Sequence, residues 1–403
     1  MVVIVKKRSI LRDLLNDSRT TGVLLFSCTI LSLIIANSND NHWFSSFWNR
    51  HFQVGSSRLK LPATPIEWIN NFGMSFFFVL AATEIKRELL GGQLSTFKKA
   101  ILPFGAAFGG MLVPAIIFAF FNFHSHYIHG WGIPTATDIA FSLAVASLLG
   151  KRFPVGLKIL LMAIAIIDDL GAIVVIALFY GNQIHWLFLM FSGLTYLGLL
   201  ACNYFKVKFG SIQIILGICM WYMMLQSGIE ASITGVLFAF ALPIKDLAVI
   251  EKAIHRYVNF LILPLFALAN TAIIIPTHVL SALNTPVGMG VIVGLVIGKP
   301  VGIFLASRLM VGLNIAQLPS HAKWNQILGM GSLAGIGFTM SIFTTMLAFS
   351  ETVVRDISKI SILISVLVSM GLSYLYFYML SLKTAGTSIQ ISESQPEMQL
   401  NVS

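Results

Sequence analysis

Long apolar stretches recur along the whole chain, and they restrict its fold more than any other feature of the sequence. Each runs for about 17 residues or more, close to the roughly 20 apolar residues that an α-helix needs to cross a bilayer core. Hydrophobic side chains make up 57% of the 403 residues and charged side chains only 10%. Because a soluble domain carries about 25% charged residues, the composition indicates an integral membrane protein.

The apolar stretches predict an all-α polytopic membrane protein with about twelve transmembrane helices. They do not alternate between apolar and polar residues, which is the pattern of membrane strands. The predicted spans lie near residues 21–37, 64–85, 101–122, 132–149, 155–179, 186–204, 211–226, 228–243, 257–275, 287–311, 325–348 and 360–381.

Lys and Arg residues gather at one set of predicted helix ends. The net charge is +10, which could suggest a nucleic-acid partner. The basic residues lie at span ends, however, and the large majority share one side of the membrane, so membrane orientation explains them better and no nucleic-acid partner is expected. The positive-inside rule then places both termini in the cytoplasm.

The sequence divides into three predicted regions. Residues 1–20 are basic and amphipathic without a signal-peptide cleavage site, and we expect a cytoplasmic segment. Residues 21–383 form the transmembrane domain. Within it, residues 41–62 are expected to form a periplasmic hairpin that turns at VGSSRL. Residues 384–403 are polar and poor in aromatic side chains, which is typical of a disordered cytoplasmic tail.

Four ionisable residues lie deep inside predicted spans: Asp138, Asp168, Asp169 and Lys299. A charge at the bilayer centre costs about 2.5–3.5 kcal/mol on insertion scales, and such residues usually mark ion pathways, proton relays or counter-ions. A purely structural polar network is the alternative. Four such groups at similar depth on three spans favour a functional site.

Asp168 and Asp169 are adjacent, and neighbouring residues on a helix point about 100° apart. One carboxylate can therefore line a water-filled cavity while the other turns toward a neighbouring helix, where Lys299 is the obvious counter-charge. Carboxylate oxygens suit hard cations and protons, and no Cys or His cluster lies at this depth to favour a softer metal.

Two spans carry signals for an interrupted helix. In the first, Pro134 precedes Thr137 and Asp138, whose side chains compete for backbone hydrogen bonds. In the second, Gly335 and Gly337 weaken the helix and Thr339 adds a hydroxyl group. Paired broken helices are typical of ion sites in secondary transporters. Close helix packing is the alternative explanation for the glycines.

Six segments resemble the NhaA-type sodium/proton antiporters of bacteria: IPTATDIAFSLAVASLLG, ILLMAIAIIDDLGAIVVIALFY, VIGKPVGI, GIGFTMSIF, WINNFGMSFFFVLAATEIKREL and LILPLFALAN. The resemblance implies inverted repeats with two interrupted, crossing helices in a multi-pass protein of the bacterial inner membrane. It also implies a transporter, not an enzyme, that exchanges cytoplasmic Na⁺ or Li⁺ for external H⁺. The exchange is expected to be electrogenic and pH-regulated, without a cofactor, in a homodimer joined through residues 41–62.

The resemblance also implies roles for particular residues. Asp168 and Asp169 would be the ion-site pair that binds Na⁺, with Asp169 as direct ligand and proton carrier, and Lys299 would pair with Asp168 or balance the half-helix dipoles. Thr137 and Asp138 would belong to the first interruption, and Gly335, Gly337 and Thr339 to the second. Glu84 would line a cytoplasmic funnel, and Glu251 and His255 would respond to pH.

Three positions depart from the pattern of the family. Asn71 replaces an aspartate, and Glu230 and Lys252 each replace a histidine. These departures concern the pH response and leave the predicted core site intact.

Two other functions are compatible with buried carboxylates. An intramembrane aspartyl protease could use Asp138 and Asp168 as a dyad, but the GxGD motif expected of such enzymes is absent and a buried lysine has no part in that chemistry. A passive cation channel would need a continuous wet pore, whereas a compact carboxylate site favours binding and exchange.

Overall fold

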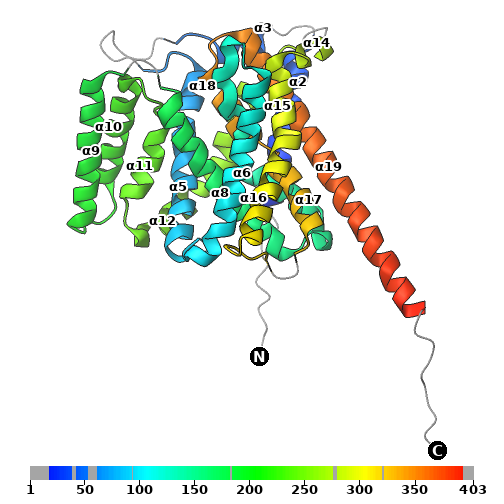
Figure 1. Cartoon of the computed structure of the whole chain (residues 1–403). Helices are drawn as coiled ribbons and strands as arrows, with labels where there is room; N and C mark the ends of the chain where they lie inside the picture. Colours follow the sequence, from blue (N-terminus) through cyan, green and yellow to red (C-terminus); the bar gives the residue numbers. More distant parts are fainter. Residues whose placement is uncertain are drawn as a thin grey trace, which may run out of the picture.

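The computed structural model describes residues 18–38, 42–52, 61–92, 94–181, 184–275, 279–319 and 322–393. Every regular element within these ranges is a helix (Figure 1). The first half comprises α2 (Ser18–Ala36), α3 (His42–Trp48), α4 (Pro65–Trp68), η1 (Ile69–Gly73), α5 (Met74–Gly91), α6 (Phe97–Phe121), η2 (His126–Thr135), α7 (Ile139–Leu148), η3 (Gly150–Arg152), α8 (Val155–Phe179) and α9 (Trp186–Tyr204). The second half comprises α10 (Ser211–Ser227), α11 (Ile233–Ala241), α12 (Ile244–Tyr257), η4 (Val258–Ile262), α13 (Leu263–Asn270), α14 (Val279–Leu283), α15 (Pro286–Val293), η5 (Gly294–Gly298), α16 (Lys299–Gly312), α17 (Trp324–Ala334), α18 (Phe338–Ala348) and α19 (Thr352–Glu393).

Six helices of the described ranges are long and apolar enough to cross a membrane. They are α6, α8, α9, the continuous helix from α12 to α13, the continuous helix from α15 to α16, and α19 as far as Leu382. The pair α17 and α18 makes a seventh span if its two halves, which bend by 50°, are counted together. This confirms the all-helical, polytopic membrane class, while the total of twelve spans stays a prediction.

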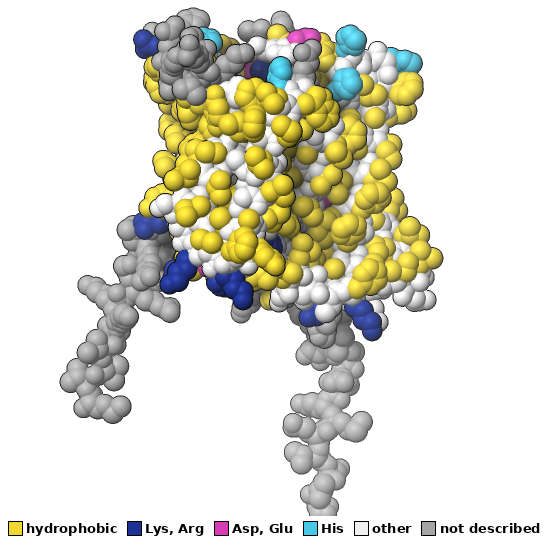
Figure 2. Space-filling view, turned by 90° about the vertical axis from the view of Figure 1, so that its left-hand side faces the viewer, with side chains coloured by type: hydrophobic (Ala, Val, Ile, Leu, Met, Phe, Trp, Pro, Cys, Tyr) yellow, Lys and Arg dark blue, Asp and Glu magenta, His cyan; other side chains and the backbone are white. Residues whose placement is uncertain are grey.

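The molecular surface has the distribution expected for a bilayer. A broad apolar belt covers the visible face, Lys and Arg side chains gather below it, and His side chains lie above it (Figure 2). Many large apolar side chains of the described residues are exposed, including those of Trp186 at 73% and Leu178 at 71%. Such continuous apolar exposure marks a membrane-facing surface.

Residues 41–62, the predicted hairpin, include the short helix α3. Beyond α3 the Phe52 amide donates to the carbonyl oxygen of Ala63, just after this segment, at 2.7 Å, and the hairpin itself stays a prediction. The predicted turn at VGSSRL and most of the predicted N-terminal segment lie outside the described residues, as does the chain beyond Glu393.

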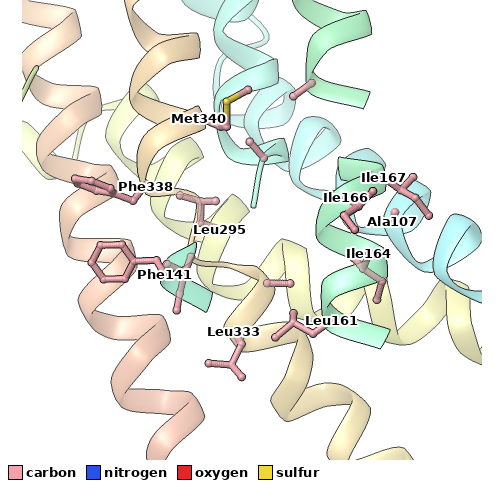
Figure 3. Packing of buried hydrophobic residues seen from close by; sticks show 14 of the residues in the cluster. Ala107, Phe141, Leu161, Ile164, Ile166, Ile167, Leu295, Leu333, Phe338 and Met340 are labelled. Carbon is pink, nitrogen blue, oxygen red and sulfur yellow. The ribbon is translucent and has the colours of Figure 1, made fainter. Parts of the chain in front are cut away.

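Helix α8 lies at the centre of the bundle, whereas α9 lies at its edge (Figure 1). Within the apolar window of each span, 67% of α8 residues are buried but only 11% of α9 residues. Side chains of α8 such as Ile164 join those of α7, η5 and α18 in one hydrophobic cluster (Figure 3). The Phe141 and Phe338 rings in this cluster have centroids 5.4 Å apart. Asp168 and Asp169 therefore lie on the most buried of the six candidate spans in the described residues.

Glycines bring α6 against α16. A Cβ atom on Gly302 would lie 2.1 Å from the Gly109 carbonyl oxygen, so the two backbones touch where no side chain fits. Close helix packing thus explains the glycine-rich stretch GAAFGGML at residues 105–112, which contains Gly109. Because Lys299 begins α16, the close contact also fixes the position of its backbone relative to α6.

Candidate ion-binding site

The first interruption separates the 3₁₀ helix η2 from α7. Helix η2 ends at Thr135, the chain is extended at Ala136 with φ −83° and ψ 155°, and Asp138 caps the amino end of α7. Pro134 and the run of Thr and Asp side chains explain the break, because they remove or compete for backbone hydrogen bonds.

The second interruption separates α17 from α18 at residues 335–337. A Cβ atom on Gly335 would lie 2.5 Å from the Leu295 carbonyl oxygen, and one on Gly337 would lie 2.8 Å from the Ala136 carbonyl oxygen. Both glycines have negative φ angles. They are needed here because the neighbouring backbones leave no space for a side chain.

The two interruptions lie against each other and are joined by hydrogen bonds. The Asp138 amide donates to the Ile336 carbonyl oxygen at 2.7 Å. The Thr137 hydroxyl lies 2.8 Å from the Ala334 carbonyl oxygen, and the Ser142 hydroxyl donates to the Leu333 carbonyl oxygen at 2.9 Å. The carbonyl groups freed at the end of α17 are thus partly satisfied by the other broken helix.

Asp138 joins the amino ends of α7 and α18. Its Oδ1 accepts from the Phe141 amide at 3.0 Å, while its Oδ2 accepts from the Thr339 amide at 3.1 Å and the Thr339 hydroxyl at 2.7 Å. The side chain is buried. A carboxylate is stabilised there because both helix termini present unpaired N–H groups and the positive end of a helix dipole.

Lys299 and Asp168 form an ion pair without solvent contact. Their Nζ and Oδ2 atoms are 2.7 Å apart, and both side chains are 0% exposed. Lys299 also donates to the Thr135 carbonyl oxygen at the end of η2. Asp168 Oδ2 lies 2.6 Å from the Thr137 hydroxyl. That hydroxyl has one hydrogen, so it can donate to Asp168 or to the Ala334 carbonyl, but not to both at once.

Asp169 faces a different environment from its neighbour. It lines a cavity of about 280 Å³, together with Asp138 and Thr339. Asp168 and Lys299 do not line this cavity. Asp169 is only 3% exposed, and its Oδ1, like that of Asp168, has no hydrogen-bond partner in the structure. The 100° separation of adjacent residues thus produces the predicted division, in which one carboxylate faces a cavity and the other faces a lysine.

The other end of the cavity carries charged residues of α5 and α12. Glu84, Arg87 and His255 line it. Arg87 Nη1 lies 2.5 Å from Oε2 of Glu251, and the two side chains are 49% and 16% exposed. Asn259 also lines the cavity, with its Nδ2 3.1 Å from Nε2 of His255. The cavity therefore connects a partly exposed charged cluster with Asp169.

The structure brings all the predicted site residues into two connected groups. One group lies where the two interruptions contact each other, a place called the crossing from here on: Thr137, Asp138, Asp168, Asp169, Lys299, Gly335, Gly337 and Thr339. The other group lies at or beside the other end of the cavity: Glu84, Glu251 and His255. None of Asn71, Glu230 and Lys252 lines the cavity. Asn71 donates to the Glu67 carbonyl oxygen at 2.9 Å, and Lys252 is exposed.

Sequence reasoning missed the Thr135 carbonyl group and Asn259. Any residue can supply a carbonyl oxygen, so the sequence holds no signal for the first beyond the position of Thr135 just before the predicted break. Asn259 follows His255 by one helical turn, a spacing at which two polar side chains meet. That spacing could have identified it.

Comparison with known proteins agrees with this geometry. Residues 12–377 match the family described as Na+/H+ antiporter 1. The chain is 42% identical over 387 residues to "Na(+)/H(+) antiporter NhaA 1" of Clostridium beijerinckii, covering 94% of this chain and 96% of the relative. It is 43% identical over 375 residues to "Na(+)/H(+) antiporter NhaA" of Flavobacterium psychrophilum (92% and 96%) and 44% identical over 371 residues to the protein of that name from Dechloromonas aromatica (89% and 93%). The chain belongs to the Na+/H+ antiporter 1 family.

Proposed function

We propose that this chain exchanges Na⁺ for H⁺ across a membrane by letting the cation and protons occupy the Asp169 carboxylate in turn. The family membership and the names of the relatives support sodium and protons as substrates. A multi-pass helical bundle with buried carboxylates supports a transporter over an enzyme.

The observation that carries the proposal is the contrast between Asp168 and Asp169. Asp168 is held by Lys299 and Thr137. Among the described residues, the Oδ1 atoms of both aspartates are buried without a hydrogen-bond partner, but only Asp169 lies on the wall of the cavity, and no lysine pairs with it. A buried carboxylate oxygen without a donor is costly unless a proton or a cation takes that place. Either species satisfies Asp169, and the two cannot occupy the same oxygen together.

The surrounding residues suit this exchange. Asp138 accepts hydrogen bonds from N–H groups at the amino ends of α7 and α18. It thereby stabilises the crossing of the two interruptions, so the site can be rigid without a continuous helix. Lys299 supplies a fixed positive charge beside Asp168, which limits the net charge that the buried site holds when the cation is absent. The cavity gives ions a route between Asp169 and the cluster around Arg87.

Further properties of the protein form part of the same proposal. The fold would contain twelve spans with inverted repeats, and both termini would lie in the cytoplasm of a bacterial inner membrane, on the side of the Lys and Arg residues. The cavity end with Glu84, Glu251 and His255 would then be a cytoplasmic, pH-responsive funnel. Transport would be electrogenic, would accept Li⁺ as well as Na⁺, and would occur in a homodimer that uses residues 41–62.

The carboxylate dyad of an aspartyl protease is not formed. Asp168 pairs with Lys299, and Asp138 accepts three hydrogen bonds from Phe141 and Thr339. The two aspartates therefore do not share a proton, which such a dyad requires.

Purified protein in proteoliposomes with an internal pH-sensitive dye provides the test. A jump in Na⁺, Li⁺ or K⁺ on one side should move protons in the opposite direction for Na⁺ and Li⁺. Adding an ionophore that collapses the membrane potential should accelerate the flux, because an electrogenic exchanger builds up a potential that opposes it.

Asp169→Asn should abolish this flux while the protein still inserts, because an amide neither carries the proton nor balances the cation. Glu351→Gln is the matched control, since Glu351 accepts from the Tyr127 hydroxyl at 3.0 Å, away from the cavity. Normal sodium-driven proton flux in Asp169→Asn would refute the assignment. Sodium flux without opposite proton flux in the unmodified protein would instead identify a channel.

A further inference from the structure

The external half of the first broken helix, η2, has an unusual conformation. It is a 3₁₀ helix of ten residues, His126–Thr135, although 3₁₀ runs longer than about four residues are uncommon because their hydrogen bonds have poor geometry. Such a segment needs other contacts to hold its shape. Side chains at the end of α8 and on α16 and α18 supply these contacts.

Tyr180 binds the backbone of η2 with one hydroxyl group. Its Oη accepts from the Gly132 amide at 3.1 Å and donates to the His129 carbonyl oxygen at 2.7 Å. Tyr180 directly follows the end of α8. The ring of Phe179 packs edge-on against Trp131 of η2, with centroids 5.1 Å apart. Residues 179 and 180, at the end of α8, thus hold the middle of η2 in place through hydrogen bonds and a ring contact.

The carboxyl end of η2 bonds to the ion site. The Ser341 hydroxyl of α18 donates to the Ile133 carbonyl oxygen at 2.8 Å, and Lys299 donates to the Thr135 carbonyl oxygen. Lys299 in turn pairs with Asp168 of α8. Tyr180 lies about three helical turns beyond Asp168. The contacts form a closed ring, because α8 reaches η2 directly through Tyr180 and again through Asp168 and Lys299.

We propose that Tyr180 is a positioning residue of the ion site, which fixes η2 so that the Thr135 carbonyl group holds Lys299 beside Asp168. This inference rests on the proposed function of the site and assigns Tyr180 no contact with the ion. The lysine has three N–H donors. When the Thr135 carbonyl moves away, the released donor can turn toward a neighbouring carboxylate and compete there with sodium.

Tyr180→Phe tests the proposal, because it removes the hydroxyl and keeps the ring. The apparent KM for sodium should rise about threefold to tenfold, the range that corresponds to one net hydrogen bond. The maximal rate per folded molecule should change much less. A role in folding alone would lower the amount of active protein and leave the KM for sodium as it is.

Gly132→Ala provides a second route to the same effect without touching the tyrosine. A Cβ atom on Gly132 would lie 2.7 Å from the Tyr180 hydroxyl oxygen, so it should push that oxygen off the backbone. Tyr127→Phe is the matched control. Tyr127 also belongs to η2, but its hydroxyl donates to Glu351 and does not bind the η2 backbone.

The assay is sodium-driven proton flux in proteoliposomes at several sodium concentrations and pH values, normalised to folded protein. A raised KM in Tyr180→Phe and Gly132→Ala, with a normal KM in Tyr127→Phe, supports the proposal. A normal KM in both test variants overturns it, as does an equal rise in Tyr127→Phe. The proposed function is tested separately, because it fails only if the unmodified protein lacks exchange or Asp169→Asn retains it.

Discussion

Lys299–Asp168 and Arg87–Glu251 are ion pairs of similar length in opposite surroundings. Their N–O distances are 2.7 Å and 2.5 Å. Both side chains of the first pair are completely buried, whereas Arg87 at the far end of the cavity is 49% exposed. Distance therefore says little about what each pair contributes. Burial determines how much each pair contributes to folding stability, because a charge that loses its partner can be solvated at the exposed end and not at the crossing.

The two regions also differ in what surrounds each pair. At the crossing, backbone groups from both broken helices supplement the side chains, as when Lys299 donates to the Thr135 carbonyl group. At the exposed end, the Arg87–Glu251 bond connects two intact helices, α5 and α12. The crossing can thus hold ionised groups in place without water, while the exposed end can rearrange with little cost.

Lys299→Ala is the change with the largest expected effect. It leaves Asp168 buried without its counter-charge, and breaking a buried pair in this way costs about 3–5 kcal/mol of folding stability. We expect a clear fall in the thermal unfolding midpoint of the detergent-solubilised protein, together with loss of transport. Lys299→Arg keeps a positive charge and should retain part of the thermal stability and part of the transport activity.

The double variant Lys299→Ala with Asp168→Asn distinguishes the effect of an unpaired charge from the effect of the packing lost when the lysine side chain is shortened. Because no unpaired charge remains, it should unfold at a higher temperature than Lys299→Ala alone. If Lys299→Ala unfolds at the same temperature as the unmodified protein, the buried pair contributes no more to folding stability than the exposed one.

The sequence predicted the crossing because charged side chains in apolar stretches are rare and conspicuous. Asp168, Asp169 and Lys299 are visible as anomalies without any structure, and the 100° between neighbours on a helix predicts that the two aspartates face different surroundings. Gly335 and Gly337 marked the second break by their weak helix propensity. These signals all depend on residue type, which the sequence states directly.

Backbone contacts were not predictable in the same way. The Thr135 and Ala334 carbonyl groups belong to the site only because η2 and α17 end there, and the length of η2 as a 3₁₀ helix follows from contacts with α8, α16 and α18. The π-helical turn η5, just before Lys299, likewise has no residue signature beyond its glycines. Tertiary packing sets these features, and it overrides local propensity.

The pH dependence of sodium binding should belong to the buried region alone. If protons and sodium compete for Asp169, the apparent dissociation constant for sodium rises about tenfold for each unit of falling pH and each competing proton. Calorimetric titration of the purified protein with sodium at several pH values measures this slope. Asp168 and Asp169 should be treated as one coupled unit in the fit.

Antiport activity should then be bell-shaped in pH, because protons fill the site at low pH and are too scarce for the return step at high pH. Raising sodium should move the acidic limb to lower pH. A sodium dissociation constant that stays constant between about pH 6 and 9, a range in which buried carboxylates titrate, would rule out direct competition. The pH response would then need a sensor elsewhere, such as the cluster around Glu251.

Arg87→Gln is the change with the smallest expected effect on folding, and it completes the comparison from the exposed side. The Arg87–Glu251 pair is partly exposed, with Arg87 at 49% and Glu251 at 16%, and exposed ion pairs contribute about 0–1 kcal/mol. We expect an unfolding midpoint close to that of the unmodified protein, with a difference that shrinks as salt is added, since salt screens exposed charges.

The slope of sodium affinity against pH should stay the same in Arg87→Gln, because the variant does not touch Asp169. The position of the activity curve along the pH axis should shift, because the variant removes a positive charge from the cavity end that holds Glu84, Glu251 and His255. Flux measured across pH in Arg87→Gln, alongside calorimetry on the same protein, separates these outcomes. A changed slope would mean that the two ends of the cavity titrate as one unit.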